Sequence, residues 1–465
     1  MRVIAGVFAA LVLLSLPATA HDFTFGADLS FANEMDDCGA SFKDKSVQKD
    51  VYAIFKDHGV NLVRIRIWNN ATWTKYSNLD DVKRSIARAK AQGQQVLLDF
   101  HYSDDWADPS KQVVPAAWAG INDDTALADA LYRYTYDTLT ALDKAGLMPD
   151  MVQTGNEINS EILMPGPWKA GQTINWARNA KLLNTAIKAV RDAGAHSTMR
   201  PKVMLHIAEP ENVEPWLATA TAAGVTDFDL IGISYYPKWS KDTLAGLGAT
   251  INRLRHRYRG VGVLVAETVY PWTLAWADSL NNQVGEADLM PAYRATPEGQ
   301  EQYLIDLSQA VIAGGGVGVI TWAPDHVSTG CRTRWGQGSD WENATLFDFH
   351  GDALPGIDFA RHQYNWPVTV TFRFHGMTPP PGQPFYLWGD FLGTNSFAVR
   401  LPDDGTALRY STTMMPGQKI RFQVFDGLSL HTRLLSGDKI VAGFATQTIP
   451  NADTVIDDVL TKPAP

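Results

Sequence analysis

The chain has 465 residues, a formal net charge of -10 and only two cysteines, and 11% of its residues are aromatic. The acidic balance argues against nucleic acid as a partner, and two cysteines exclude a cysteine-rich disulfide scaffold. A chain of this length exceeds what one compact core usually organises, so we expect a large domain and a smaller one.

The first twenty residues have the pattern of a secretory signal peptide. Arg2 precedes an apolar run that continues to Leu16, and the small-residue ending Ala18-Thr19-Ala20 follows. The run is too short and wrongly flanked for a membrane span, and no later apolar stretch is long enough to cross a bilayer. We therefore expect cleavage near Ala20 and a secreted or periplasmic protein whose mature chain begins at His21.

Residues 21–366 alternate short runs rich in Val, Ile, Leu and aromatic residues with polar loops and amphipathic segments. The eight runs span residues 23–30, 61–68, 95–102, 151–158, 201–208, 230–237, 262–270 and 317–324. Helical periodicity is clearest in residues 80–93 and 173–194, and each of these segments ends in glycine, a helix stop signal. Eight such units predict a (β/α)8 TIM barrel. A doubly wound open sheet is the alternative, but no glycine-rich phosphate-binding motif follows any strand.

The character of the sequence changes after Trp366. Segments such as "VTVTFRF" and "KIRFQVFDG" alternate apolar and polar residues with a period of two, and no helical segment of useful length remains. We predict that residues 367–465 form a separate antiparallel β-sandwich. Tyr386 and Trp388 share one face of a strand by alternation, which would suit a carbohydrate-binding module. A purely structural sandwich is the other interpretation.

The carboxyl ends of the strands in such a barrel meet on one face, where catalytic residues sit. The polar and aromatic residues at these ends are Arg64, Arg66, Trp68, Asp99, His101, Asn156, Glu157, His206, Tyr235, Tyr236, Glu267 and Trp322. A single glutamate at a strand end is commonly solvated or salt-bridged, but so many polar groups on one rim indicate a site. Glu157 and Glu267 follow the fourth and seventh strands, nearly opposite in the ring. Two facing carboxylates are what cleavage of a glycosidic bond requires.

No metal or cofactor is predicted. The histidines show no His-x-x-x-His spacing, and the two cysteines are far apart in the chain. Calcium bound by loop oxygens stays open. We expect a monomer whose partner is a polysaccharide, with neither nucleic acid nor a membrane as a partner.

Six segments carry a resemblance to a known family. In chain order they are "GADLS", "GVNLVRIRIW", "LLDFHYSDDWADP", "MVQTGNEI", "DFDLIGISYYPKW" and "VAETVYPW". Through them, residues 23–360 resemble the arabinogalactan endo-β-1,4-galactanases of glycoside hydrolase family 53. The resemblance implies a (β/α)8 barrel that hydrolyses β-1,4-galactan, the side chain of pectic polymers, with retention of anomeric configuration.

The resemblance also implies roles for individual residues. Glu157 would be the general acid/base and Glu267 the nucleophile, about 5 Å apart as retention requires. Asn156 would hydrogen-bond the sugar 2-hydroxyl. Arg64 would keep Glu267 ionised, while the pKa of Glu157 should be raised so that it can donate a proton. The remaining candidates for shaping the cleft or contacting substrate are His101, Asp105, Trp106, Tyr236, Trp68 and Trp322.

Two segments depart from the family pattern. Ala323 in "TWAPDHV" stands where the family usually has a glutamate, and "HIAEPENVEP" replaces an Asp-rich loop after the fifth strand. Both segments belong to the face on which substrate subsites form.

The cysteines are expected to pair. Cys38 follows the first strand and Cys331 follows the eighth, and these two strands are neighbours in a closed barrel, so we predict a disulfide. Two other functions remain as alternatives. One is a related barrel hydrolase of another β-1,4-glycan, such as mannan or cellulose. The other is a glycan-binding barrel without turnover, against which the presence of both glutamates argues.

Overall fold

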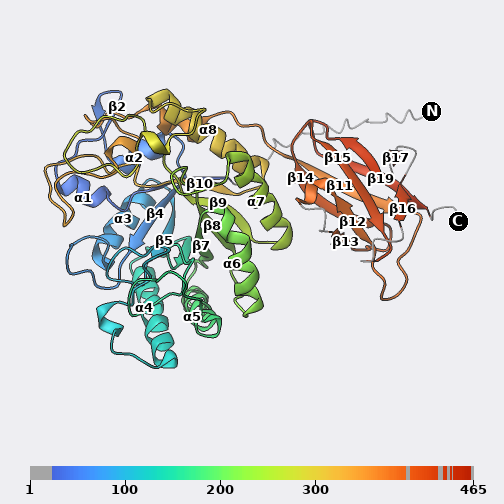
Figure 1. Ribbon diagram of the computed structural model, residues 1–465, viewed down its shortest axis with the longest axis horizontal. Coiled ribbons are helices and arrows are strands. Elements are labelled where there is room, and N and C mark those ends of the chain that lie inside the picture. The colour runs from blue at the N-terminus through green and yellow to red at the C-terminus, as the bar shows by residue number, and fades with distance from the viewer. Residues whose placement is uncertain (1–22, 394–397, 428–432, 437–439, 442–443, 462–465) are drawn as a thin grey trace, which may run out of the picture.

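The computed structural model describes residues 23–393, 398–427, 433–436, 440–441 and 444–461. The predicted signal peptide therefore lies outside the described residues. The larger part of the chain is a closed barrel of parallel strands in the ring order β1-β10-β9-β8-β7-β6-β5-β4 (Figure 1). Its strands are β1 (Thr24–Asp28), β4 (Leu62–Ile67), β5 (Gln95–Phe100), β6 (Met151–Thr154), β7 (Lys202–Ala208), β8 (Leu230–Ser234), β9 (Gly262–Glu267) and β10 (Gly318–Thr321). The predicted TIM barrel is confirmed.

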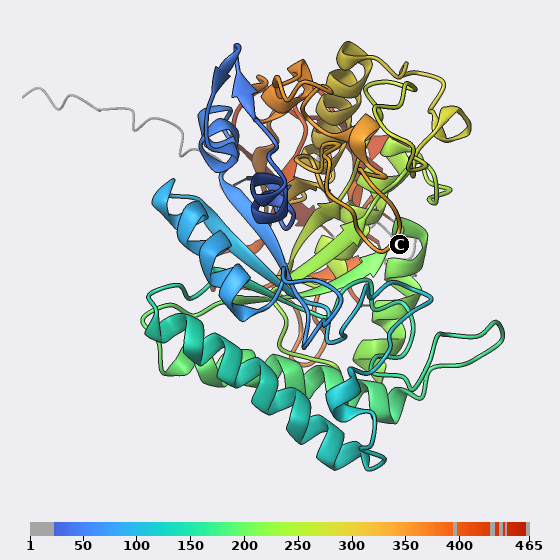
Figure 2. The same ribbon diagram turned by 90° about the vertical axis from the view of Figure 1, so that its left-hand side faces the viewer.

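Helices surround the strands (Figure 2). They are α1 (Ala32–Asp37), α2 (Val51–Asp57), α3 (Leu79–Ala91), α4 (Asp124–Lys144), α5 (Trp176–Ala195), α6 (Pro210–Ala222), α7 (Leu244–Arg257) and α8 (Pro297–Ala313). The two helices predicted in detail correspond to α3 and α5. The Asn78 side chain caps α3 by accepting from the backbone N–H groups of Asp80 and Asp81, which fixes its start. No helix among the residues described above is long and apolar enough to cross a membrane.

Short elements complete the barrel region. A two-stranded hairpin of β2 (Lys43–Asp44) and β3 (Val47–Gln48) follows α1. The 3-10 segments are η1 (Ala116–Trp118), η2 (Glu286–Asp288), η3 (Glu342–Ala344) and η4 (Pro355–Arg361). The segment η4 follows β10 and packs against α8. It takes the place of the helix that would follow the last strand of the barrel.

The inside of the barrel is apolar at one end and polar at the other. The apolar end is a cluster of buried side chains formed by Leu62, Leu97, Met151, Met204, Leu230, Leu264, Ala266 and Ile320. Side chains that point inward recur every second residue along a strand. Two residues beyond Leu62, Leu97 and Met204, the inward positions hold Arg64, Asp99 and His206, all of them fully buried. The same strands therefore supply both the apolar plug and the polar floor of a site at their carboxyl ends.

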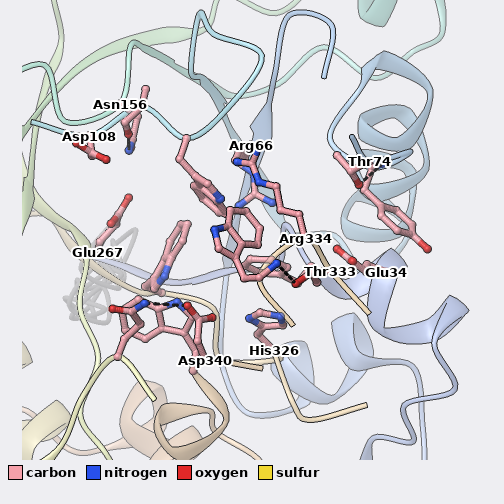
Figure 3. A pocket seen from close by; sticks show the side chains of 18 of the residues that line it. Glu34, Arg66, Thr74, Asp108, Asn156, Glu267, His326, Thr333, Arg334 and Asp340 are labelled. Carbon is pink, nitrogen blue, oxygen red and sulfur yellow. Dashed lines mark hydrogen bonds between the residues drawn. The ribbon is translucent and has the colours of Figure 1, made fainter. Parts of the chain in front are cut away.

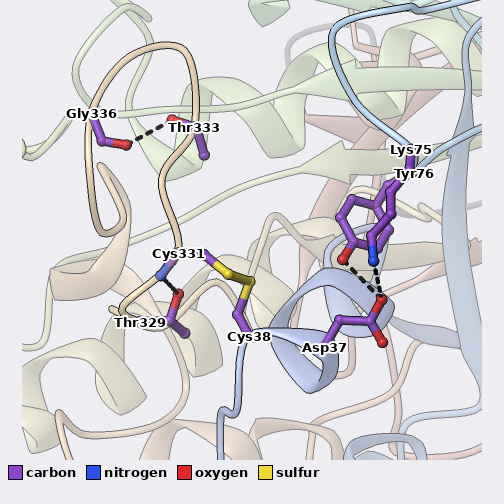
Figure 4. Close-up of a disulfide and its surroundings, with 8 residues drawn as sticks. All are labelled: Asp37, Cys38, Lys75, Tyr76, Thr329, Cys331, Thr333 and Gly336. Atoms are coloured by element: carbon purple, nitrogen blue, oxygen red, sulfur yellow. Dashed lines mark hydrogen bonds and ion pairs between the residues drawn. A yellow bond between two sulfur atoms is a disulfide. The ribbon is translucent and has the colours of Figure 1, made fainter.

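The predicted disulfide is present. Cys38 directly follows α1 and is bonded to Cys331, 293 residues later in the chain. Figure 4 shows the bond at the base of the loop that carries Thr333 and Gly336. The disulfide therefore ties the loop after β1 to the loop after β10 at the rim of the barrel.

The C-terminal part is a β-sandwich with its own apolar core. Its elements are β11 (Val368–His375), β12 (Tyr386–Gly389), η5 (Asp390–Leu392), β13 (Ala398–Arg400), β14 (Leu408–Met414), β15 (Lys419–Phe425), β16 (Arg433–Ser436), β17 (Ile440–Val441), β18 (Phe444–Thr448) and β19 (Thr454–Thr461). The strand pairs are antiparallel as predicted, except that β11 and β19 run parallel.

The sandwich contacts the barrel through the end of α7. Arg255 donates hydrogen bonds to the side chain and the backbone carbonyl of Thr413, both at 2.9 Å. Where the chain passes to the sandwich, Trp366 packs edge-on against Phe23, which precedes β1. Both contacts lie at the amino ends of the barrel strands, away from the rim where catalytic groups are expected.

The strand face that would carry a sugar-binding platform, one of the two interpretations of the sandwich, is covered at Trp388. Trp388 is only 7% exposed, and its ring packs against Phe444 at 5.3 Å between centroids. The alternation along β12 correctly placed Tyr386 and Trp388 on one face, but β18 covers the Trp388 end of it. The position of the covering strand depends on pairing across the sheet, which the local alternation does not specify.

The disulfide generates the first testable prediction. We expect that replacing both Cys38 and Cys331 by serine lowers the free energy of unfolding by about 2–4 kcal/mol, because the bond closes a long loop in the unfolded chain. Thermal unfolding of the variant and the wild type measures the loss. A reductant should lower the melting temperature of the wild type and leave that of the variant unchanged. Two titratable thiols in the folded, unreduced wild type would contradict the bond.

Candidate active site

Glu157 projects from a sharp turn that ends β6. Gly155 has φ +97°, and a Cβ added there would lie 2.6 Å from the side chain of Ile158, so only glycine fits. Glu157 itself has φ +46°, a left-handed conformation that is unfavourable for a residue with a side chain. The turn directs Asn156 and Glu157 into the mouth of the barrel instead of along the strand direction.

Arg64 lies at the centre of the polar end of the barrel and is completely buried. Its guanidinium contacts three carboxylates, those of Asp28 at 2.9 Å, Asp99 at 2.8 Å and Glu267 at 2.8 Å. It also donates to the side-chain oxygen of Asn156 at 2.7 Å. Burial opposes its charge, but the three carboxylates raise the pKa of Arg64 overall, so it stays a cation.

Glu267 ends β9 and is held by an ion pair and a hydrogen bond. Arg64 contacts one carboxylate oxygen at 2.8 Å, and the Tyr236 hydroxyl donates to the other at 2.7 Å. Burial raises the pKa of Glu267 to about 7, while Arg64 and Tyr236 each lower it. Arg64 therefore acts in the direction that the resemblance implies, but burial and the nearby Asp28 and Asp99 outweigh it. Burial is the largest of these effects, and the two aspartates that share the Arg64 guanidinium with Glu267 add to it.

Glu157 has a different environment. Its Oε1 accepts a hydrogen bond of 2.6 Å from the Ser234 hydroxyl, which in turn lies 2.9 Å from Nε2 of His206. Glu157 is thus hydrogen-bonded to a neutral hydroxyl, whereas Glu267 contacts a cation in addition to a hydroxyl. Burial, followed by the charge of Glu267, raises the pKa of Glu157 well above its ordinary value. The predicted separation of roles, with one carboxyl group kept protonated, has a physical basis in these contacts.

Both glutamates line a cleft of about 630 Å³ at the carboxyl ends of the strands. The predicted residues that line it are Glu157, Glu267, Asn156, Trp68, Trp106, Tyr236 and Trp322. In the view of Figure 3, Asn156, Asp108 and Glu267 lie on one side of the pocket and Glu34, Thr74 and Thr333 on the other. The side-chain nitrogen of Asn156 donates to the Ala107 carbonyl at 2.8 Å, which leaves its second hydrogen for a ligand.

Three predicted contact residues do not line the cleft. Arg64 lies beneath it. His101 is 2% exposed, contacts Asp99 through Nε2 at 3.0 Å and accepts from the Ala107 backbone, so it positions the loop and not the substrate. Asp105 forms ion pairs with Lys111, at 2.7 Å, and with Arg334. These residues support the cleft from behind, which a position at a strand end does not reveal.

Other residues of the cleft escaped the sequence reasoning. Ser234, the partner of Glu157, is the last residue of β8, but the predicted strand ran on to residue 237 and hid it. Four tryptophans on loops line the cleft and were not predicted, namely Trp73, Trp239, Trp335 and Trp341. No periodic pattern marks a loop residue, so only the aromatic-rich composition pointed to them.

The family departure at Ala323 has no direct effect on the cleft wall. Ala323 is 1% exposed and does not line the pocket. Within the described part of the chain, no group of three or more His, Cys, Asp or Glu side chains is arranged to hold a metal ion.

Comparison with known proteins places the barrel in one family. The profile of glycosyl hydrolase family 53 matches residues 24–360. The arabinogalactan endo-β-1,4-galactanase of Cellvibrio japonicus is 49% identical over 344 residues, which cover 74% of this chain and 91% of that protein. The endo-β-1,4-galactanase of Bacillus subtilis is 32% identical over 378 residues, which cover 72% of this chain and 85% of that protein.

A solved structure supports the same relationship. The family 53 catalytic domain of Ignisphaera aggregans is 35% identical and superposes with a TM-score of 0.68, covering 75% of this chain and 98% of that domain. The family match ends before β11, so the C-terminal sandwich lies outside it.

The buried charge cluster yields a stability prediction. Replacing Arg64 by methionine leaves Asp28, Asp99 and Glu267 without their cation, so we expect a loss of about 3–5 kcal/mol in the free energy of unfolding. Arg84→Met is the matched control, because Arg84 forms only an exposed ion pair with Asp37 and should cost at most about 1 kcal/mol. Urea unfolding measures both. Equal losses of unfolding free energy in Arg64→Met and Arg84→Met would show that the buried cluster stabilises the fold no more than an exposed ion pair does.

Proposed function

The chain belongs to glycosyl hydrolase family 53, and from this premise we propose that it is an endo-acting hydrolase of β-1,4-galactan in which Glu157 and Glu267 carry out a double displacement. The observation that supports this most directly is the difference between the two carboxyl groups. Glu267 contacts a cation and a hydroxyl, Glu157 accepts from a hydroxyl, and both carboxyl groups face a single cleft. This is the pair of environments that a retaining glycosidase requires.

In the first step, the Glu267 carboxylate attacks the anomeric carbon and forms a covalent glycosyl ester. The bond to the leaving oxygen breaks as Glu157 donates its proton to that oxygen. Tyr236 and Arg64 hold the attacking carboxylate in place through its two oxygens. The fixed orientation saves the entropy of arranging the reactants at the moment of attack.

In the second step, Glu157 acts as a base. Once Glu267 is esterified, its negative charge is gone, and with it the repulsion that helps to raise the pKa of Glu157. Glu157 then remains ionised and removes a proton from water, which attacks the anomeric carbon and releases the sugar from Glu267. The same electrostatic coupling thus sets Glu157 as an acid first and as a base afterwards.

Galactan is the proposed substrate because the related proteins named above are β-1,4-galactanases. Another β-1,4-glycan, such as mannan or cellulose, is the competing substrate, since the carboxyl pair itself acts on any sugar that the cleft admits. Tryptophan side chains in the cleft suit the apolar faces of pyranose rings. We further propose that the protein is exported, on the basis of the signal-peptide pattern of residues 1–20. The sandwich serves as a docked structural domain on the far side of the barrel.

The test is hydrolysis of galactan, mannan, xylan and cellulose by the wild type, Glu267→Ala and Glu157→Gln. We expect the wild type to release oligosaccharides from galactan and Glu267→Ala to be slower by at least about a thousandfold. Glu298→Gln, which changes an exposed glutamate in the first turn of α8, is the matched control. Hydrolysis that survives Glu267→Ala would refute the mechanism, and faster cleavage of mannan or cellulose would refute the substrate.

The contact between Tyr236 and Glu267 predicts a change in pH dependence. The Tyr236 hydroxyl stabilises the charged form of Glu267, so Tyr236→Phe should raise the pKa of that carboxyl group. Since the nucleophile must be ionised, the acidic limb of the kcat/KM profile should move to higher pH by roughly one pH unit.

Tyr235→Phe is the control for this variant. The Tyr235 hydroxyl donates to the Asp242 carbonyl and does not reach a carboxylate, so the acidic limb should stay in place. An unshifted acidic limb in Tyr236→Phe would mean that the hydrogen bond does not tune the nucleophile.

A further inference from the structure

Two buried side chains connect Glu157 to the interior of the barrel. The Ser234 hydroxyl donates to Oε1 of Glu157 at 2.6 Å, and the same hydroxyl lies 2.9 Å from Nε2 of His206. Ser234 is 1% exposed and His206 is fully buried, so both lie beneath the surface that a ligand touches. Whatever they contribute to the reaction must therefore act through Glu157.

Gln153 on β6 is a donor to one nitrogen of the His206 ring. Its side-chain oxygen accepts from Nε of Arg64 at 3.1 Å, and its side-chain nitrogen donates to Asp99 at 2.6 Å. Because an arginine only donates and a carboxylate only accepts, these two contacts fix the orientation of the amide. The amide nitrogen consequently lies 3.0 Å from Nδ1 of His206 as a donor.

A second donor is directed at the same ring nitrogen. The backbone N–H of Glu157 donates to Nδ1 at 3.4 Å. Oδ1 of Asn156 also lies 3.0 Å from Nδ1, but this oxygen already accepts from Arg64 at 2.7 Å. Burial and the charge of Arg64 lower the pKa of His206 well below its ordinary value, so the ring is neutral. With two donors facing Nδ1, the hydrogen of the neutral ring is on Nε2.

The directions of the remaining hydrogen bonds follow from this tautomer. Nε2–H of His206 donates to the Ser234 oxygen, so the Ser234 hydroxyl directs its own hydrogen to Oε1 of Glu157. An oxygen that accepts this hydrogen bond does not carry the acid proton, which is therefore on Oε2. Glu157 lines the cleft, and Oε2 is the oxygen that Ser234 does not occupy.

We propose that Ser234 and His206 are positioning residues that hold the acid proton of Glu157 on Oε2, where it can pass to the leaving oxygen of the substrate. The proposal rests on the proposed function for the role of Glu157 as the proton donor. With the opposite tautomer, Ser234 would donate to His206 and accept from Oε1, and the acid proton would point into the protein. The buried pair excludes this unproductive arrangement before the substrate binds.

The test compares hydrolysis of β-1,4-galactan and of a dinitrophenyl β-galactobioside by the wild type and Ser234→Ala. Dinitrophenolate leaves without a proton, whereas the sugar leaving group of galactan needs one. For Ser234→Ala, kcat/KM on galactan should fall by about tenfold, and kcat/KM on the aryl substrate should change by less than about twofold. Ser234→Thr keeps the hydroxyl and should recover most of the loss.

The pH profile gives a second measurement on the same variant. The Ser234 hydroxyl lowers the pKa of Glu157 against the larger effects of burial and of Glu267, which raise it. Removal of the hydroxyl should raise that pKa, so the basic limb of kcat/KM on galactan should move to higher pH by roughly half to one pH unit. The other charged or titratable groups near the pair, all retained in the variant, are Glu209 and Asp108 beside Glu157, and Arg64, Asp99 and His101 beside His206.

Ser85→Ala is the matched control. Ser85 is also a buried serine, 2% exposed, and its hydroxyl accepts from the Asn33 side chain at 2.8 Å. It lies on α3, outside the barrel strands, and its loss should leave kcat/KM on both substrates and the basic limb as in the wild type. A loss in Ser234→Ala that is equal for galactan and the aryl substrate, or an unshifted basic limb, would overturn the proposal.

Nitrogen-15 NMR of protein labelled in its histidine rings tests the tautomer directly. His206 is identified as the ring whose signals change in Ser234→Ala and Ser234→Thr but not in Ser85→Ala. It should be neutral with its hydrogen on Nε2 from about pH 5 to pH 8, and a hydrogen on Nδ1 would overturn the proposal. If the wild type hydrolyses neither substrate, the proposed function fails. The NMR result then decides alone, since the Nε2–H form supports the arrangement and the Nδ1–H form overturns it.

Discussion

The Arg64 guanidinium is the contact on which the rest of the site depends. A buried cation is costly unless carboxylates surround it, and buried carboxylates are equally costly without a cation. Here one cation serves Asp28, Asp99 and Glu267, so the cluster carries an excess of negative charge. Burial is the main cause that raises the pKa of Glu267 to about 7 although it contacts an arginine, and the excess of negative charge adds to this effect. It also strengthens the tendency of nearby Glu157 to keep its proton.

The charge cluster exists because the barrel interior changes from apolar to polar along each strand. A cluster of buried side chains, mostly leucine and methionine, fills the amino end. Along each strand, the next inward-pointing position towards the carboxyl end holds a polar residue. These residues face one another inside the closed barrel and form hydrogen bonds with one another. A rigid set of donors results, and such a set lowers the reorganisation needed during a reaction. The catalytic carboxyl groups are therefore held by the same side chains that complete the core.

The loops supply the aromatic side chains of the cleft. Tryptophans after β4, β5 and β10 build one wall of the cleft, and the disulfide joins two of the loop regions at the rim. The sandwich contributes nothing to this wall, because it contacts the end of α7 and lies near the amino ends of the strands. The cleft thus lies on one face of the barrel, and the added domain contacts another.

The sequence by itself determined the order of the elements and pointed to two carboxyl groups that face the cleft. Alternation of apolar runs with helical periods predicted all eight strands, since local periodicity reflects which side chains are buried. The polar strand ends pointed to Glu157 and Glu267, because strands of a parallel barrel must bring their carboxyl ends to one rim. The neighbouring positions of the first and last strands led to the pairing of Cys38 with Cys331.

Tertiary structure alone decided which residues face the cleft and which lie behind it. His101 and Asp105 occupy a loop that the sequence marks as functional, yet their side chains turn toward other protein groups. Trp388 was placed on the correct face of its strand, but a distant strand covers it. The loop that carries Trp335 is tied to distant segments by the ion pair of Arg334 with Asp105 and by the disulfide of Cys331 with Cys38. Exposure and contact depend on pairings between distant residues, and no local pattern in the sequence records them.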